Sequence, residues 1–308
     1  MIPKSWTIKE LLTVTTSYLK KKQIENPRLT SEILLAHQLN RDRVGLYLNF
    51  DQPLAGKELS GYRSLIRRRL LREPLQYITG VQEFWSLALR VSPQVLIPRP
   101  ETELLVEQAA VRVKAIIEEE NRTPMILDIG TGCGAVAIAL AEEFKEVCVW
   151  ATDISAGALG MARLNAEEHG VSDRIRFVEG DLLKPLFNQG MTFHIVLSNP
   201  PYVTSEEYND LPPEVRDYEP RLALDGHEGG MYHIEKIIRG GPEFIRPGGW
   251  LLLEMAPHQT EKALSLMEEV GEYAERTRIR DYSNHYRVVM ALRAGRESSF
   301  TNISEDPL

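Results

Sequence analysis

The strongest constraint on the fold is a regular alternation of short apolar runs with longer amphipathic segments after residue 125. Short apolar runs bounded by turn residues are typical of buried strands, and the longer segments are typical of helices. Strands joined through helices run parallel, so the pattern predicts an α/β fold with a mainly parallel sheet. The predicted strands cover 125–129, 147–152, 175–178, 193–198 and 250–254, with helices over 135–143 and 155–169. An antiparallel hairpin of 278–281 and 287–292 is predicted to end the domain.

Residues 1–75 have a different pattern, which predicts a small N-terminal all-α bundle. The first helix begins with a capping box at Thr7 and Glu10, and further helices are predicted over 30–39, 43–48 and 57–72. This part carries 14 Lys and Arg against 7 Asp and Glu, a net charge of +7, whereas the rest carries 22 against 37, a net charge of −15. We interpret the basic bundle as a recognition module. The alternative, that its charges only solvate outer helix faces, stays open.

Residues 76–98 are predicted to form a β-hairpin linker, followed by a domain that spans 99–293. Glu83–Val91 alternates like a strand and Gln94–Ile97 like its partner, with Ser92-Pro93 as the turn. Pro100 and the glutamates after it favour a helix start, which should extend to about residue 120. The polar tail, 294–308, is predicted to be disordered.

The composition indicates a soluble, cytoplasmic protein. Hydrophobic residues make up 43% and charged residues 26% of the chain, and the N-terminus lacks the pattern of a signal peptide. No apolar stretch reaches the roughly 20 residues that span a bilayer. The two cysteines, Cys133 and Cys148, give no disulfide framework, which agrees with a reducing compartment. The seven histidines form no pair with ligand spacing, so we predict no metal.

A glycine-rich loop follows the first predicted strand, with the sequence Asp128-Ile129-Gly130-Thr131-Gly132-Cys133-Gly134. Its three glycines allow the backbone to turn tightly and to approach a ligand closely. The third glycine comes one residue too early for the usual pyrophosphate fingerprint, and the acidic residue beside the loop favours a cation. S-adenosyl-L-methionine fits this description, because it carries an ammonium and a sulfonium group and no phosphate.

The next two strand ends supply polar side chains for the same ligand. Asp153 lies where doubly wound sheets place the carboxylate that bonds ribose hydroxyls. Asp181 is placed to receive the exocyclic amine of adenine, and Leu182 is placed to cover the ring. Cys133 is expected to line the loop rather than to act as a nucleophile, since no histidine or second cysteine lies near it in the sequence.

At the end of the fourth predicted strand the sequence reads Asn199-Pro200-Pro201-Tyr202. Two successive prolines lack a backbone N–H and cannot continue a sheet, so the chain must leave it here. The Asn199 side chain and the Pro200 carbonyl then offer hydrogen-bond acceptors, and Tyr202 offers an aromatic face. These groups suit a planar NH₂ group, which makes Asn199, Pro200 and Tyr202 the catalytic candidates. In isolation the motif would more often be a proline turn with Tyr202 as packing, but its place after the three other strand ends favours a methyltransferase.

Nearly the whole chain, from Thr7 to Leu292, resembles the peptide-chain release factor glutamine N5-methyltransferases, which are class I S-adenosylmethionine-dependent methyltransferases. Beyond the motifs above, three stretches are similar to this family: Glu73–Gly80, Ile97–Glu103 and Tyr218–Leu224. The resemblance implies a helical N-terminal domain, a hairpin linker and a Rossmann-like seven-stranded catalytic domain. It also implies methylation of the glutamine side-chain amide in the Gly-Gly-Gln loop of release factors.

The resemblance carries site roles onto this chain by position. It implies cosubstrate contacts at Gly130, Thr131, Gly132, Cys133, Gly134, Asp153, Asp181, Leu182 and Asn199. It implies contacts with the substrate amide at Asn199, Pro200 and Tyr202. The other expected substrate-site residues are Pro201, Pro98 and Arg99.

Two other functions are weighed against this one. A nucleic-acid amino methyltransferase would use the same pocket for a flipped adenine or guanine. The acidic body offers no strand-binding surface, although the basic bundle could be one, so nucleic acid is not the expected substrate. A cofactor-binding protein without catalysis is disfavoured by the intact Asn199 and Tyr202. We expect a monomer that acts on release factors and does not associate with membranes.

Overall fold

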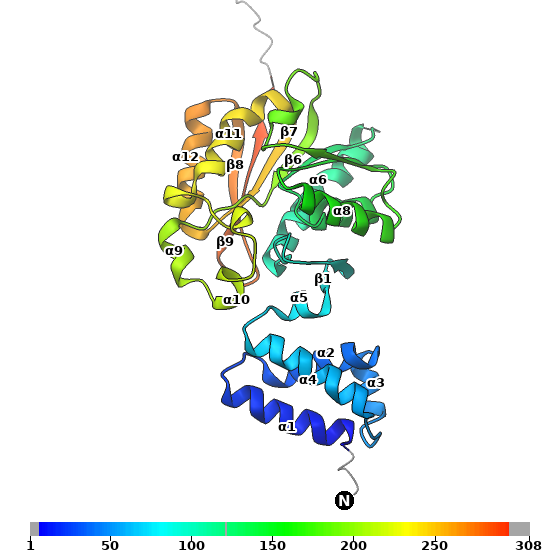
Figure 1. The fold of residues 1–308 in the computed structure, drawn as a ribbon. Helices are drawn as coiled ribbons and strands as arrows, with labels where there is room; N and C mark the ends of the chain where they lie inside the picture. Colours follow the sequence, from blue (N-terminus) through cyan, green and yellow to red (C-terminus); the bar gives the residue numbers. More distant parts are fainter. Residues whose placement is uncertain (1–5, 121, 296–308) are drawn as a thin grey trace, which may run out of the picture.

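The computed structural model describes residues 6–120 and 122–295, and Figure 1 shows two parts joined by a narrow connection. The first part is helical, and the second is a seven-stranded sheet with helices on both faces. The fold class predicted from the sequence is confirmed. The predicted disordered tail lies outside the described residues from residue 296 onward. None of the described helices combines the length and the apolar character that crossing a membrane requires.

Four helices form the N-terminal domain around one apolar core. They are α1 (Ile8–Lys21), α2 (Pro27–Leu39), α3 (Arg43–Leu48) and α4 (Gly56–Leu70). The predicted capping box is present, because the Glu10 N–H donates to Thr7 Oγ1 (3.3 Å) and the Thr7 N–H donates to Glu10 Oε2 (3.0 Å). At the centre, the buried Tyr62 donates its hydroxyl to the carbonyl of Ser31 (3.1 Å), which joins α4 to α2.

The connection contains a short helix and a hairpin, at positions that differ from those predicted. The elements are α5 (Leu75–Thr79), β1 (Val81–Phe84) and β2 (Leu87–Arg90). The predicted pairing of 83–91 with 94–97 around Ser92-Pro93 is wrong, because β1 pairs with β2 and 94–97 forms no strand.

The hairpin turn lies at Trp85 and Ser86, which both have positive φ (52° and 59°). A two-residue turn with positive φ at both positions matches the twist of the flanking strands, but it usually contains asparagine or glycine. Here the turn is held from outside: the backbone N–H of Trp85 donates to Glu103 and its indole N–H donates to Glu143, at 2.9 Å each. The sequence therefore carried no local signal for this turn.

The C-terminal domain is built on a sheet with the strand order β5-β4-β3-β6-β7-β9-β8. The strands are β3 (Met125–Ile129), β4 (Cys148–Asp153), β5 (Ile175–Glu179), β6 (Phe193–Ser198), β7 (Ile245–Glu254), β8 (Tyr273–Arg280) and β9 (Tyr286–Arg293). Neighbours from β5 to β7 are parallel, and β9 is antiparallel to both β7 and β8. The predicted parallel sheet and terminal hairpin are thus confirmed. β7 begins at Ile245 rather than at Trp250, since its two glycines lie within the strand.

Helices cover both faces of this sheet. α6 (Glu103–Glu120), α7 (Ala135–Glu143) and α8 (Ala156–Glu168) share one core, whereas α11 (Tyr232–Phe244) and α12 (Thr260–Val270) share the other. Ile126 of β3 joins the first core and Leu127 joins the second, because successive side chains of a strand point to opposite faces. This two-sided burial explains why the strands read as continuous apolar runs.

A segment that we call the strap, residues 204–226, joins β6 to the α11 region and contacts both domains. It contains α9 (Ser205–Asp210), α10 (Pro213–Arg216) and the 3₁₀ turn η3 (Arg221–Ala223), and α10 lies on the side that faces the helical domain (Figure 1). Glu214 accepts hydrogen bonds from Arg69 (3.0 Å) and Arg72 (3.3 Å). Tyr218 donates its hydroxyl to the carbonyl of Leu71 (2.6 Å). The strap thereby fastens the end of the helical domain to the C-terminal domain.

The first prediction concerns this attachment. Arg69 is buried, so Glu214→Gln leaves its guanidinium without a counter-charge and should lower the free energy of unfolding by about 1–3 kcal/mol. Urea unfolding measures the change. Asp217→Asn removes an exposed ion pair of the same strap and should cost less than about 1 kcal/mol. Equal, small effects of both substitutions would contradict the prediction.

Two carboxyl groups are buried near strand ends, Asp128 in β3 and Glu254 at the end of β7. Burial raises the pKa of each to about 7, from ordinary values of 3.8 for Asp128 and 4.5 for Glu254. Between these pH values the folded state keeps protons that the unfolded state has released. The contribution of these groups to stability is therefore complete in acid and is lost as the pH rises from about 4 to about 7.

The second prediction follows from this titration. Asp128→Asn replaces the carboxyl group with an amide that does not ionise, so the free energy of unfolding of the variant, relative to that of the native protein, should rise between about pH 4 and about pH 7. Denaturant unfolding at several pH values measures the difference. The exposed Asp173→Asn is the matched control. A constant difference between Asp128→Asn and the native protein would show that Asp128 does not titrate in this range.

Candidate active site

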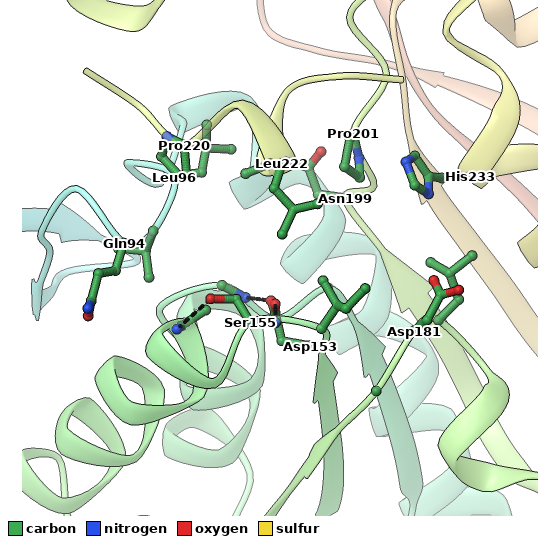
Figure 2. A pocket seen from close by; sticks show the side chains of 18 residues that line it. Gln94, Leu96, Asp153, Ser155, Asp181, Asn199, Pro201, Pro220, Leu222 and His233 are labelled. Carbon is green, nitrogen blue, oxygen red and sulfur yellow. Dashed lines mark hydrogen bonds between the residues drawn. The ribbon is translucent and has the colours of Figure 1, made fainter. Parts of the chain in front are cut away.

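The carboxyl ends of the parallel strands surround one cavity of about 840 Å³, measured with its open mouth (Figure 2). The walls come from the glycine loop after β3, the segments that follow β2, β4, β5 and β6, the strap and α11. The site lies where the strand order reverses between β3 and β6, the usual place for ligands of open parallel sheets.

The glycine loop, residues 130–134, joins β3 to α7. Gly130, Gly132 and Gly134 have φ values of +72°, +59° and +87°, which glycine adopts without strain. At Gly134 a Cβ would lie 2.9 Å from the Ile138 side chain and 3.2 Å from Ala162 Cβ, so this glycine also lets α7 pack closely on α8. Gly130 and Gly132 line the cavity and leave open space beside their backbone.

Asp153 at the end of β4 holds the loop and faces the cavity (Figure 2). Its Oδ2 accepts from the N–H of Gly132 and its Oδ1 from the N–H of Ser155, at 2.9 Å each. Burial raises the pKa of Asp153, and hydrogen bonds from these N–H groups act in the opposite direction. The carboxyl group is thus fixed in place with accepting capacity left for ligand hydroxyls.

Asp128 supports the loop from below and does not line the cavity. It is 2% exposed and accepts from the hydroxyl of Thr131 (2.7 Å). The sequence interpretation of Asp128 as the acidic group that attracts a cationic ligand is therefore not supported by its position.

Cys133 is also buried, and burial raises the pKa of its thiol to about 12, which keeps the sulfur protonated and unreactive.

Asp181 and Leu182 form the wall after β5. The Asp181 carboxylate pairs with Lys184 Nζ (2.7 Å), and this hydrogen bond holds the pKa of the carboxyl group below its usual value. Leu182 has a φ of +52°, which is uncommon outside glycine and marks a strained backbone at the ligand wall. His233 of α11 lies on the same side of the view as Asp181 (Figure 2), with a buried Nδ1 that has no hydrogen-bond partner in the described part of the chain.

The corner Asn199-Pro200-Pro201-Tyr202 follows directly after β6. Asn199 Nδ2 donates to Thr102 Oγ1 (2.9 Å), which leaves the amide oxygen of Asn199 for another partner. The Tyr202 hydroxyl donates to Glu254 Oε1 (3.4 Å), and burial raises the pKa of Tyr202. Asn199 and Pro201 line the cavity, whereas Pro200 and Tyr202 do not.

The backbone of Tyr202 is held by segments from which the sequence allowed no inference. Its carbonyl accepts from Gln259 Nε2 (2.8 Å). A Cβ at Gly226 would lie 2.7 Å from Tyr202 Cα, and one at Gly230 would lie 2.3 Å from Tyr202 O. These two glycines therefore let the loop 226–230 pack directly against the corner.

Pro98 and Arg99, which were expected to wall the substrate pocket, do not line this cavity. Arg99 instead pairs with Glu219 of the strap (2.6 Å), and Glu219 also accepts from the N–H of Ile97 (3.1 Å). Glu219 is buried, so the pair fixes the strap to the segment before α6.

The cavity brings together residues from every strand end that the sequence singled out. The predicted residues that line it are Gly130, Gly132, Asp153, Asp181, Leu182, Asn199 and Pro201. The predicted residues that do not line it are Thr131, Cys133, Gly134, Pro98, Arg99, Pro200 and Tyr202. The individual roles of all these residues stay predictions.

Sequence reasoning missed 11 of the 18 residues that line the cavity. Ile154 and Ser155 directly follow Asp153 and could have been included for that reason. The other missed lining residues are Gln94, Val95, Leu96, Ala158, Gly180, Pro220, Leu222, Ala223 and His233. The three strap residues among them belong to Tyr218–Leu224, whose similarity to the family was the available signal, whereas α11 reaches the cavity only through tertiary contacts. Within residues 6–120 and 122–295, no three His, Cys, Asp or Glu side chains gather as a metal site would require, and the absence of a metal stays a prediction.

Comparison with known proteins extends the likeness over both domains. Residues 10–80 match the PrmC N-terminal domain and residues 102–211 the methyltransferase small domain. The release factor glutamine methyltransferase of Geobacter sulfurreducens is 44% identical over 87% of this chain and 91% of that protein. The protein of the same name from Chlorobaculum tepidum is 45% identical over 82% and 86%, and that from Rhodopirellula baltica is 38% identical over 94% and 97%.

Among solved structures, the catalytic domain of hMettl16 in complex with a 3′UTR hairpin aligns with a TM-score of 0.53 and 16% identity, over 72% of this chain and 80% of that chain. At this identity the likeness concerns the fold alone. The relatives above match at far higher identity, over 82% to 94% of this chain. The chain belongs to the family of release factor glutamine methyltransferases.

Proposed function

We propose that this protein transfers a methyl group from S-adenosyl-L-methionine to the side-chain amide nitrogen of the glutamine in the Gly-Gly-Gln motif of peptide chain release factors. The observation that carries the proposal is the likeness to release factor glutamine methyltransferases over both domains. It is supported by the position of Asn199, which directly follows β6 and lines the cavity at the carboxyl ends of the parallel strands.

The donor set of the cavity fits this cosubstrate. The carboxyl group of Asp153 is fixed by two backbone N–H groups and suits ribose hydroxyls. Asp181 suits the exocyclic amine of adenine, and Leu182 suits a contact with the ring face. When bound, the cosubstrate supplies an electrophilic methyl group on a sulfonium sulfur. The residues of the chain hold and orient it.

The substrate amide is proposed to lie at the proline corner. The hydroxyl oxygen of Thr102 accepts a hydrogen bond from the NH₂ group of Asn199. The amide oxygen of Asn199 therefore remains as an acceptor for a hydrogen of the substrate amide. The carbonyl of Pro200 is the second proposed acceptor. The aromatic ring of Tyr202 is proposed to hold the plane of the substrate amide. Pro201, Pro98 and Arg99 form the proposed outer part of the substrate site.

The chemistry requires positioning more than proton abstraction. An amide nitrogen is a poor nucleophile, because its lone pair is delocalised into the carbonyl. Alignment of the nitrogen with the methyl carbon supplies on the order of 7–11 kcal/mol. As the nitrogen–carbon bond forms, the carbon–sulfur bond breaks and its electron pair stays on sulfur. Positive charge then grows on nitrogen, the hydrogen bonds to Asn199 and Pro200 strengthen, and the nitrogen finally releases one proton to water.

We further propose that the helical domain recognises the release factor and that the enzyme acts as a cytoplasmic monomer. Support comes from the net charge of +7 in residues 1–75 and from the match of residues 10–80 to the PrmC N-terminal domain. No specific feature favours the alternative of a nucleic-acid amino methyltransferase. Labelled cosubstrate offered with release factor, with its Gly-Gly-Gln glutamine-to-alanine variant, or with RNA separates the two functions.

The third prediction concerns Asn199. Asn199→Ala should lower kcat by roughly 100- to 1000-fold, because it removes an acceptor that is strongest in the transition state. Cosubstrate affinity, measured by calorimetry, should change little. Asn209→Ala replaces an exposed asparagine of the strap and should leave both quantities unchanged. Normal turnover of Asn199→Ala would exclude the proposed role.

The fourth prediction concerns the basic domain. Arg63→Glu with Arg67→Glu reverses two exposed charges on α4 and should raise the KM for release factor by roughly tenfold, with little change in kcat. Lys114→Glu with Lys145→Glu makes the same charge change on the C-terminal domain. An equal rise of KM in the two double variants would show that the net charge of the protein matters rather than the charge of the helical domain.

A further inference from the structure

We propose that His233 is a specificity residue for the cosubstrate, and that its Nε2 donates a hydrogen bond to an adenine ring nitrogen beside the exocyclic amine. This inference rests on the proposed function, in which S-adenosyl-L-methionine fills the cavity and Asp181 accepts the adenine amine. It gives a role in base recognition to α11, which the proposed function leaves without one.

The fold places His233 near the wall that is proposed to hold adenine. α11 packs on the segment that follows β5, because Leu183 shares a core with Ile234. A Cβ at Gly240 of α11 would lie 2.8 Å from Leu183 Cδ1, so the helix contacts this segment closely. His233 and Asp181 both line the cavity, and they lie on the same side of the view in Figure 2.

The imidazole ring of His233 is held by two other rings. The ring of Tyr232 lies 5.1 Å from it, between centroids, at an interplanar angle of 86°, and the ring of His227 lies 5.4 Å away at 39°. Aromatic rings at these separations attract one another in specific geometries. His227 belongs to the loop 226–230, which packs against the proline corner, so the orientation of the imidazole is fixed by the fold.

The two ring nitrogens of His233 have different surroundings. Nδ1 is buried and has no hydrogen-bond partner within residues 6–120 and 122–295. Nε2 is not buried in this way, so it is the nitrogen that a ligand in the cavity can reach. Burial lowers the pKa of His233, and the charge of His227 acts in the same direction, so the ring is neutral near pH 7.

A neutral imidazole carries one N–H hydrogen, which lies on one of its two nitrogens. A buried N–H without an acceptor is rarer in proteins than an acceptor with an unused lone pair. The hydrogen of His233 therefore favours Nε2, and Nδ1 keeps the unused lone pair. In this tautomer His233 presents a hydrogen-bond donor to the cavity.

This donor complements the edge of adenine that carries the amine. The amine donates hydrogen bonds, and the ring nitrogens N1 and N7 on either side of it accept them. The Asp181 carboxylate is an acceptor and the His233 imidazole is a donor. Together they match the amine and one of the two neighbouring ring nitrogens.

The test measures the binding of S-adenosylhomocysteine, the demethylated cosubstrate, to the full-length protein by calorimetry. Three analogues carry a CH group in place of N1, N7 or N3, and the 3-deaza compound is the control because N3 lies away from the amine. His233→Phe removes both ring nitrogens and keeps an aromatic ring, whereas His233→Gln keeps an N–H donor at the level of Nε2. His37→Phe changes an exposed histidine of α2 and is the control for the substitution.

We expect His233→Phe to weaken the binding of S-adenosylhomocysteine by roughly 3- to 10-fold, and His233→Gln and His37→Phe to change it by less than about twofold. In the native protein either the 1-deaza or the 7-deaza compound should bind more weakly than the 3-deaza compound by a similar factor. This difference should be lost in His233→Phe, because the variant and the analogue each lack one partner of the same hydrogen bond. With release factor, the KM for the cosubstrate should rise more than kcat falls.

Equal affinities of the native protein for the 1-deaza, 7-deaza and 3-deaza compounds would overturn this inference and leave the proposed function in place. This measurement needs no variant, so it decides the matter even if His233→Phe does not fold. A difference among the analogues that persists unchanged in folded His233→Phe would also overturn it, because another group would then bind the ring nitrogen. Failure of the native protein to bind S-adenosylhomocysteine at all would instead reject the cosubstrate of the proposed function.

Discussion

The inability of Pro200 and Pro201 to donate backbone hydrogen bonds determines the geometry of the active edge. β6 lies between β3 and β7, where a continuing strand would be paired on both sides. The two prolines force the chain out of the sheet directly beside the cavity, and the freed backbone must find other partners. It finds them in the side chain of Gln259 and in the strap, where the N–H of Val203 donates to the carbonyl of Leu224 (3.0 Å).

The corner is rigid because its supports are buried and come from distant parts of the chain. Thr102 precedes α6, Glu254 ends β7, Gly226 ends the strap and Gly230 follows it. Buried polar groups that satisfy one another fix orientation more strongly than exposed ones, since water does not compete for their hydrogen bonds. A reaction that depends on the alignment of a weak nucleophile requires such fixed orientation more than it requires a reactive side chain.

The sequence revealed the parts of this site that depend on local patterns. Apolar periodicity located the strands, and the residues after them located Gly130, Asp153, Asp181 and Asn199 at one edge of the sheet. Burial could not be read in the same way, so Asp128 was assigned to the ligand although it points into the protein. The hairpin was misplaced because a turn at Trp85 and Ser86 depends on Glu103 and Glu143, which hold it from outside. His233 reaches the cavity only through tertiary packing.

The strap is attached both to the cavity wall and to the helical domain, so it links movement of the wall to movement of that domain. Pro220 and Leu222 form part of the cavity wall, and a few residues earlier Glu214 and Tyr218 are bonded to the helical domain. An outward movement of this wall must either break those bonds or carry the helical domain with it. By thermodynamic reciprocity, whatever strengthens the seating of the helical domain also retains the contents of the cavity, and a filled cavity favours the seated domain to the same degree. With the helical domain as the proposed contact for the release factor, exchange of the spent nucleoside would be tied to departure of the protein substrate.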